Sequence, residues 1–150
     1  MANETAAPAG CTNLKLRQAS RLVTRHYERF IRASGLKITQ YSLLSHVVKL
    51  GPQRAGELAA VMQLDASTLS RNLQPLLEQG WLAVHAGEDA RQRIVEATPE
   101  GQALRQRAQR AWKQAQVALN QRLGETRVVA LHALLDECAA LLADAENDDE

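Results

Sequence analysis

Residues 65–79, DASTLSRNLQPLLEQ, carry four polar side chains at helical spacing: Ser67, Thr68, Arg71 and Gln74. Leucines fall on the opposite side of the same helix: Leu69, Leu73, Leu76 and Leu77. Arginine pairs with guanine, glutamine pairs with adenine, and hydroxyls bond to base edges or phosphate. This pattern predicts a helix that buries its leucines and reads DNA with its polar side. A merely solvated helix side is the alternative, but it usually carries more Lys and Glu.

Three charges alternate in the stretch HAGEDARQRIV, residues 85–95: Asp89, Arg91 and Arg93. Apolar residues lie on both sides of this stretch, which predicts a two-stranded hairpin with Gly87 in its loop. Arg91 is the candidate for a minor groove, whose negative potential attracts arginine. Asp89 is expected to order the loop by accepting hydrogen bonds from Arg93 or Arg91. The alternative is an exposed salt bridge that contributes ~0–1 kcal/mol.

Helical patterns position these two segments. Three short helices are predicted before the hairpin, over residues 39–50, 54–62 and 65–79, with Thr39 and Asp65 as N-caps. Short turns between them indicate a helix-turn-helix unit. After the hairpin, Thr98-Pro99-Glu100 predicts the start of a long helix that runs to about Leu123.

Long amphipathic helices are predicted at both ends of the chain, over residues 14–31 and beyond Gly124. Their apolar stripes exceed what the small middle unit can cover, which favours a homodimer formed by the two ends. One helix side also carries an arginine row, interpreted as solvated, with a phosphate-facing or ligand-facing stripe as the alternative: Arg17, Arg21, Arg25 and Arg29.

The predicted fold class is mainly α: a winged helix-turn-helix with a two-stranded β wing and long N- and C-terminal helices that form a dimerisation domain. Residues 1–34 and 99–143 are assigned to dimerisation, and residues 39–98 to DNA binding. Five of the 17 acidic residues fall within 144–150, which predicts a disordered acidic tail. The preceding 143 residues carry 18 basic and 12 acidic side chains, a balance that permits polyanion binding.

Several function classes are disfavoured by composition. No secretory signal and no run of ~18 apolar residues is visible, and the two cysteines are far apart, which together indicate a cytoplasmic protein away from the membrane. Neither a metal-ligand spacing nor a phosphate-binding glycine loop is present, and no nucleophile is paired with a base. We therefore expect no metal, no cofactor and no enzymatic activity.

The run from Thr39 through Gly101 resembles the MarR family of bacterial winged-helix transcription regulators. The most specific sign is the D-x-R-x-R pattern of residues 89–93, reinforced by TLSRNLQPLLEQGWL. The resemblance implies a symmetric dimer on double-stranded DNA with a pseudo-palindromic operator. It also implies that Ser67, Thr68 and Arg71 read the major groove and Arg91 the minor groove. Arg54 stands where the family often has Ser or Thr, and a phosphate contact is expected there.

The resemblance further implies repression that is relieved by a signal. The leading expectation is release by a small aromatic or phenolic ligand, with Arg21, Arg25 and His46 as candidate contacts. One alternative is redox sensing by Cys11, near the start of the first helix, where a helix N-terminus and the neighbouring Lys15 would favour a reactive thiolate.

Cys138 lies in a leucine stripe and is interpreted as a core residue, with an intersubunit Cys11–Cys138 disulfide as a weaker alternative. The alternative function from another class is a winged-helix module that binds protein rather than DNA.

Overall fold

The computed structural model describes residues 7–148 of the chain. Two compact units divide it, residues 1–112 and 113–150, and each is considered by itself. The first contains α1 (Thr12–Ile31), a 3₁₀ turn (Arg32–Ser34), α2 (Ile38–Leu50), β1 (Gln53–Arg54), α3 (Ala55–Val61), α4 (Ala66–Glu78), β2 (Leu82–Ala86) and β3 (Arg93–Ala97). Helix α5 (Pro99–Leu123) begins in the first unit and ends in the second, which also holds α6 (Glu125–Asp148).

The start of α2 differs from its prediction. Its N-cap is Lys37 rather than Thr39. The side chain of Glu28, on α1, accepts a hydrogen bond from the Ile38 N–H at 2.8 Å, and Gln40 Oε1 accepts one from the Lys37 N–H at 3.0 Å. The first N–H groups of a helix need acceptors from outside it. The Glu28 carboxylate, ten residues upstream, supplies one of these acceptors. The residues around the start of α2 do not indicate this contact.

Helices α3 and α4 form the predicted helix-turn-helix. The connecting turn passes through Gln63, whose φ of 52° lies in the left-handed region. Asp65 caps α4 as predicted, since its carboxylate accepts a hydrogen bond from the Thr68 N–H at 2.7 Å. Pro75 lies inside α4, one turn before the helix ends. The first turns of α4 therefore keep a regular backbone.

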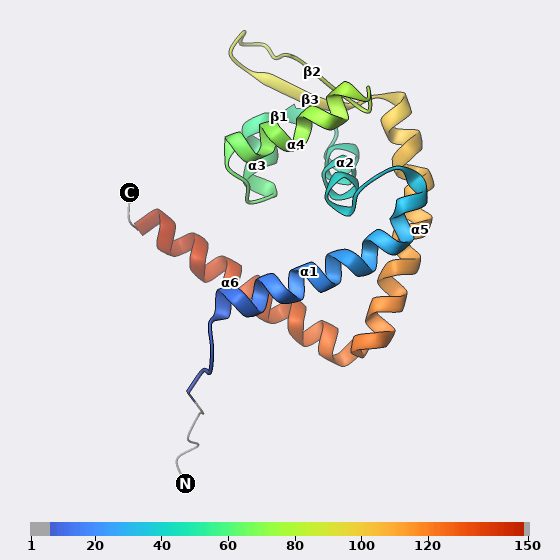
Figure 1. Cartoon of the computed structure of the whole chain (residues 1–150). Coiled ribbons are helices and arrows are strands. Elements are labelled where there is room, and N and C mark those ends of the chain that lie inside the picture. The colour runs from blue at the N-terminus through green and yellow to red at the C-terminus, as the bar shows by residue number, and fades with distance from the viewer. Residues whose placement is uncertain (1–6, 149–150) are drawn as a thin grey trace. The chain divides into compact units, whose positions relative to one another are not determined.

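The sheet has three antiparallel strands in the order β1-β3-β2, where the sequence predicted two. Leu82 pairs with Ala97 and Ala86 with Arg93, so β2 and β3 form the expected hairpin. β1 adds two residues on the other edge of β3, with Gln53 opposite Val95. A two-residue strand directly after Gly51-Pro52 is too short for a period-2 pattern, and only pairing with a distant strand defines it. Figure 1 shows the hairpin beside α4.

The start of α5 is tied to the end of the helix-turn-helix. Thr98 Oγ1 accepts a hydrogen bond from the Gly101 N–H at 3.1 Å and donates one to the Gly80 carbonyl at 2.6 Å. A Cβ at Gly101 would lie 2.0 Å from the carbonyl oxygen of Trp81, so only glycine fits there. The predicted N-cap is confirmed, and it anchors α5 to the base of the hairpin.

One hydrophobic core joins α2, α3, α4, the sheet and the first part of α5. Its fully enclosed side chains include Leu44, Leu58, Leu76, Val95 and Ala108. Helix α6 contrasts with this core, because its leucines remain 40–69% exposed: Leu131, Leu134, Leu135, Leu141 and Leu142.

The predicted disordered tail, residues 144–150, is helical as far as Asp148. Residues 149 and 150 lie outside the described part of the chain. The preceding turns of α6 are rich in alanine and leucine, which have high helix propensity. Extending such a helix into a short acidic segment costs little free energy. None of the described helices combines the length and apolar character needed to cross a membrane.

Candidate nucleic-acid interface

Helix α4 presents its polar side to solvent, as predicted. Ser67, Arg71 and Gln74 are exposed and Thr68 is partly exposed. On the opposite side Leu69, Leu73 and Leu76 are buried to 3% exposure or less, whereas Leu77 is only partly buried. The helix is therefore held by its leucines, and its polar side is free to meet a ligand.

A hydrogen-bond network built on Asp65 organises the first turn of α4. Its Oδ1 accepts from Ser67 Oγ at 2.7 Å, and its Oδ2 accepts from Thr68 Oγ1 at 2.9 Å. Arg71 Nη2 donates to Thr68 Oγ1 at 3.3 Å. The Ser67 hydroxyl first, then the N–H and hydroxyl of Thr68, lower the pKa of Asp65 to about 2. The carboxylate is ionised at neutral pH and keeps this turn ordered.

The network also sets the polarity of the two hydroxyls. The hydroxyl groups of Ser67 and Thr68 both donate their hydrogen to the Asp65 carboxylate. Each hydroxyl oxygen therefore presents its lone pairs to solvent as a hydrogen-bond acceptor. Arg71 already occupies one lone pair of Thr68. Further along the helix, Gln74 Nε2 donates to Glu78 Oε1 at 3.0 Å. The surface thus combines hydroxyl acceptors with a guanidinium donor.

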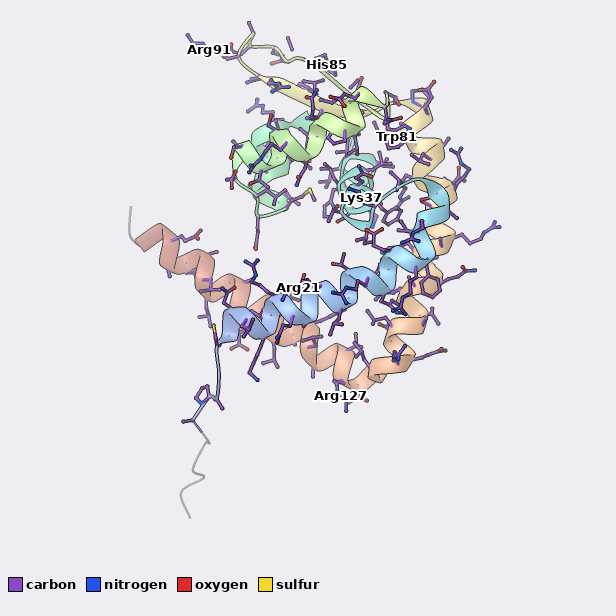
Figure 2. All side chains as sticks on the ribbon, viewed as in Figure 1. Arg21, Lys37, Trp81, His85, Arg91 and Arg127 are labelled. Atoms are coloured by element: carbon purple, nitrogen blue, oxygen red, sulfur yellow. The ribbon has the colours of Figure 1, made fainter. Side chains whose placement is uncertain are left out.

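Arg91 lies at the outer end of the hairpin, and His85 lies further back along β2 (Figure 2). The loop is closed by the Gly87 N–H to Gln92 O at 2.9 Å and by the Gln92 N–H to Asp89 O at 2.8 Å. Asp89 Oδ1 accepts a hydrogen bond from the backbone N–H of Arg91 at 3.1 Å.

The predicted hydrogen bond from Arg91 to Asp89 is present, but its donor is the backbone N–H of Arg91 rather than a guanidinium. A carboxylate two residues before an N–H closes a compact turn, and this local bond competes with a long, flexible guanidinium. The Asp89 side chain still orders the loop, but it leaves both guanidiniums available. Further back on the hairpin, His85 Nδ1 of β2 lies 3.7 Å from Glu96 Oε1 of β3.

A shallow groove brings three predicted residues together. Arg54, the N-cap of α3, lines it with Glu57 from one side, and Arg91 and Arg93 line it from the hairpin. The pairing of β1 with β3 places Arg54 opposite Ile94, next to Arg93 in the chain. The strand that the sequence did not predict is thus the element that joins Arg54 to the wing.

A second groove contains residues that the sequence analysis missed as ligand contacts. Lys37, Thr39 and Gln40 at the start of α2 line it, together with Arg71 and Asn72 of α4. Figure 2 shows Lys37 at this end of α2. The helical pattern identified the start of α2 only as the beginning of a helix. A lysine just before a helix does not indicate from the sequence which residues of another helix will lie beside it.

Among the three predicted effector contacts, His46 lines a cavity. Arg21 and Arg25 are exposed on α1, whereas His46 borders a hollow of about 320 Å³ between α2 and α5. Its walls are Ile38, Tyr41, Ser42, Ser45, His46, Lys49, Arg105, Gln109 and Trp112. The rings of Tyr41 and Trp112 are stacked with centroids 6.0 Å apart.

Polar groups of this cavity are held in place. His46 Nδ1 donates a hydrogen bond to the Ser42 carbonyl oxygen at 2.7 Å, because a carbonyl oxygen can only accept. Arg105 Nε donates to the buried Ser45 hydroxyl at 3.4 Å. Lys49 and Arg105 went unnoticed in the sequence because they are 56 positions apart and meet only through helix packing.

Both cysteines are free and exposed. Cys11 is the N-cap residue of α1, and no side-chain hydrogen bond caps this helix. Cys138 is exposed on α6, so the interpretation of this thiol as a core residue is wrong for the single chain. Within residues 7–148, no three His, Cys, Asp or Glu side chains are grouped as a metal site would require.

Comparison with known proteins places this geometry in a family. The sequence model of the MarR family matches residues 34–92. The uncharacterized HTH-type transcriptional regulator YwoH of Bacillus subtilis is 28% identical over 88 residues, which are 59% of this chain and 64% of that protein. The matched segment thus spans less than two thirds of that relative.

Solved structures cover more of the chain. The M. tuberculosis transcriptional regulator MosR, crystallised in complex with DNA, is 34% identical with a TM-score of 0.77, over 87% of this chain and 97% of MosR. A mutant of E. coli MarR with operator DNA also gives a TM-score of 0.77, at 20% identity over 84% and 91% of the two chains, which shows the fold alone. With its winged helix-turn-helix and its match to MosR over nearly the full length, the chain belongs to the MarR family.

Proposed function

We propose that this protein is a DNA-binding transcriptional regulator that reads an operator with α4 and the β2–β3 wing. The carrying observation is the two-sided α4: leucines buried to 3% exposure or less, and a polar side exposed beside the hairpin that bears Arg91. Family membership supports the same class, because MosR and E. coli MarR have both been crystallised with DNA. In this proposal α4 enters the major groove and Arg91 the neighbouring minor groove.

The two grooves of the first unit supply phosphate contacts in this proposal. Arg93 lies on the wing and Arg54 lies beside it, and Lys37 at the start of α2 lines the same groove as Arg71 of α4. Cations that meet phosphates give affinity and register without reading sequence. Ser67 differs from them, because its hydrogen is engaged by Asp65 and its free lone pairs suit an exocyclic amino group of adenine or cytosine.

A homodimer completes the proposal. Leucines remain exposed on both terminal helices, and a two-fold axis would bury them while presenting two copies of α4. Two recognition helices on one face of B-DNA require half-sites about one helical turn apart, so the operator is a pseudo-palindrome.

Replacing Arg71 or Arg91 with Ala tests the DNA interface. Each change is expected to weaken binding to DNA from upstream of the protein's own gene by ~5–100-fold and to make its salt dependence shallower. Gel-shift titrations at several salt concentrations measure both effects.

Arg110→Ala is the matched control, because it removes one exposed cation from α5 and should leave binding unchanged. Unchanged affinity in both Arg71→Ala and Arg91→Ala would contradict the proposed interface. It would favour a winged-helix module that binds protein instead.

Repression relieved by a small aromatic anion is the second part of the proposal. The cavity between α2 and α5 offers stacked rings beside the cations Lys49 and Arg105. A flat ring with a carboxylate or phenolate would place its face on Tyr41 or Trp112 and its charge near Arg105. A ligand there would alter the packing of α2 on α5, and through α2 the placement of α4.

Benzoate and the neutral benzyl alcohol provide the probes for this cavity. Benzoate is expected to reduce DNA binding in the wild type more than benzyl alcohol does, and Arg105→Ala with Lys49→Ala should raise the benzoate concentration required by ~10-fold or more. A fluorescence titration of Trp112 alongside gel shifts measures both events. Equal responses of wild type and double variant would exclude this cavity as the effector site.

A further inference from the structure

The turn between α1 and α2 is held in place by one side chain. Ser34 Oγ donates a hydrogen bond to the Ile31 carbonyl at 2.7 Å and accepts one from the Leu36 N–H at 3.3 Å. Ile31 and Leu36 are themselves buried, at 0% and 2% exposure. The chain is therefore fixed on the core just before it reaches Lys37 and enters α2.

Glu28 adds a hydrogen bond from α1 to the first turn of α2. Its Oε1 accepts from the Ile38 N–H at 2.8 Å, and both residues are partly buried. This bond joins residues ten positions apart, so it ties the start of α2 to the last turn of α1. A carboxylate at a helix N-terminus also interacts favourably with the helix dipole. Glu28 therefore both caps α2 and attaches it to another helix.

Lys37, the residue just before Ile38, lines a groove together with Arg71 of α4; Figure 2 labels Lys37. The groove has a volume of about 180 Å³, and Leu43 and Pro75 also line it. No acidic side chain is among the described residues that border this groove. Two cations that share such a groove match an anion, and phosphate is the anion that duplex DNA presents.

The place of Lys37 depends on how the first turn of α2 is held. Its N–H donates to Gln40 Oε1 at 3.0 Å, but this bond lies within the first turn and would move with it. The Glu28 bond differs, because it comes from outside α2. Loss of the Glu28 acceptor would leave the Ile38 N–H without this partner and would allow the first turn to fray, which moves Lys37 away from Arg71.

We propose that Glu28 is a positioning residue for DNA binding: it holds Lys37 beside Arg71, so that both cations meet the same stretch of phosphate backbone. The inference rests on the DNA-binding function proposed above and adds to it a residue of α1 that contacts no DNA. It reverses the usual effect of an acidic side chain. Removing a negative charge ordinarily strengthens the attraction of a protein to phosphate, whereas removing Glu28 weakens binding.

Three substitutions of Glu28 in the full-length protein separate its reach from its charge. Glu28→Gln keeps an acceptor oxygen at the same reach but removes the charge, so its binding should be at least as tight as in the wild type. Glu28→Asp keeps the charge but withdraws the acceptor by one methylene, and Glu28→Ala removes the acceptor. Both should weaken binding to DNA from upstream of the protein's own gene by ~3–10-fold.

A double-mutant cycle with Lys37 identifies the residue through which Glu28 acts. Lys37→Ala is expected to weaken binding by a similar factor and to reduce the slope of log affinity against log salt by about 1, the loss of one phosphate contact. Glu28→Ala should reduce the slope in the same way. It should have no further effect when Lys37 is already alanine. Fluorescence anisotropy titrations with labelled DNA at several salt concentrations measure affinity and slope.

Glu125→Ala is the matched control, because it removes an exposed acid from the first turn of α6 and should not weaken binding. Circular dichroism verifies that each variant is folded, and titration at protein concentrations well above Kd gives its active fraction. Partial unfolding lowers the active fraction but leaves the salt slope unchanged. Instability is therefore distinguished from the loss of a phosphate contact by Lys37.

The inference is overturned if Glu28→Ala keeps the wild-type affinity and slope, or if Glu28→Gln binds as weakly as Glu28→Ala. Additive losses in the double variant with Lys37→Ala also overturn it, because Glu28 then acts elsewhere. In each case, weaker binding by Arg71→Ala or Arg91→Ala still supports the proposed function. If those two variants also bind DNA like the wild type, the proposed interface fails together with the inference.

Discussion

Asp65 shows how one side chain can prepare a binding surface at the scale of a residue. It caps α4, holds the hydrogens of Ser67 and Thr68, and lies near Arg71, which is linked to it through Thr68. The cap was predictable because Asp before a helical pattern is a strong local signal. Its effect on the hydroxyl hydrogens was not, since that depends on rotamers. Asp65 contacts no base in the proposal, but it determines that the hydroxyls of Ser67 and Thr68 face solvent as hydrogen-bond acceptors.

Asp65→Ala is expected to lower the stability of the protein at neutral pH, because α4 loses its N-cap. The native pKa of about 2 lies below the ordinary value of 3.8, so the stabilisation is fully present above about pH 4 and is lost as pH falls toward 2. The difference in unfolding free energy between wild type and variant should shrink over that window. Urea unfolding at pH 6, 4, 3 and 2 measures it.

Asp65→Asn serves as the comparison, since an amide still caps a helix but does not titrate. It should be less destabilising than Asp65→Ala at pH 6. A constant difference between wild type and Asp65→Ala from pH 6 to pH 2 would contradict the assigned pKa.

Each helix and strand packs on the core through its buried side. Hydrophobic periodicity predicted that side correctly for α4, but it did not predict every element. The spacing of the leucines predicted which side of α4 faces the core. Leucines three and four residues apart all lie on one side of a helix, and that side must be the buried one. The same reasoning missed β1, whose two residues have no period of their own. It also misplaced the start of α2, where Glu28 reaches across from α1. Elements held by contacts distant in sequence escape local patterns.

Leu76→Ala is expected to destabilise the protein by about 2–5 kcal/mol, because Leu76 is fully buried and its removal leaves a cavity. Leu77→Ala, one residue on, should cost clearly less, since that side chain is only partly buried. Chemical denaturation of both variants measures the two values. Equal losses would show that α4 is rotated from the orientation described.

At the scale of the whole molecule, both terminal helices keep large apolar side chains exposed. Leucines on α6 stay 40–69% exposed, far more than a core helix would leave, and α1 carries further exposed leucines. The sequence predicted this excess of apolar surface from the length of the terminal helices.

Operator spacing tests the proposed dimer at this scale. Inserting ~5 bp between the half-sites of a footprinted operator rotates one half-site by about half a turn. Binding should fall toward the affinity for a single half-site, because two linked copies of α4 cannot then reach both grooves. Gel shifts with the parent and lengthened operators measure the loss. Undiminished binding to the lengthened site would contradict a rigid dimer.

The sequence by itself determined the order of helices, the polar side of α4, the hairpin and the caps at Asp65 and Thr98, because each depends on residues a few positions apart. Only the tertiary structure decided which of the candidate residues meet. It joined Arg54 to the wing through β1, brought Lys37 beside Arg71, and closed a cavity between His46 and Arg105. These contacts span many residues of chain, and they form because buried apolar surface folds the elements together. Local sequence patterns determine the secondary structure of each segment, and tertiary packing determines which segments lie next to one another.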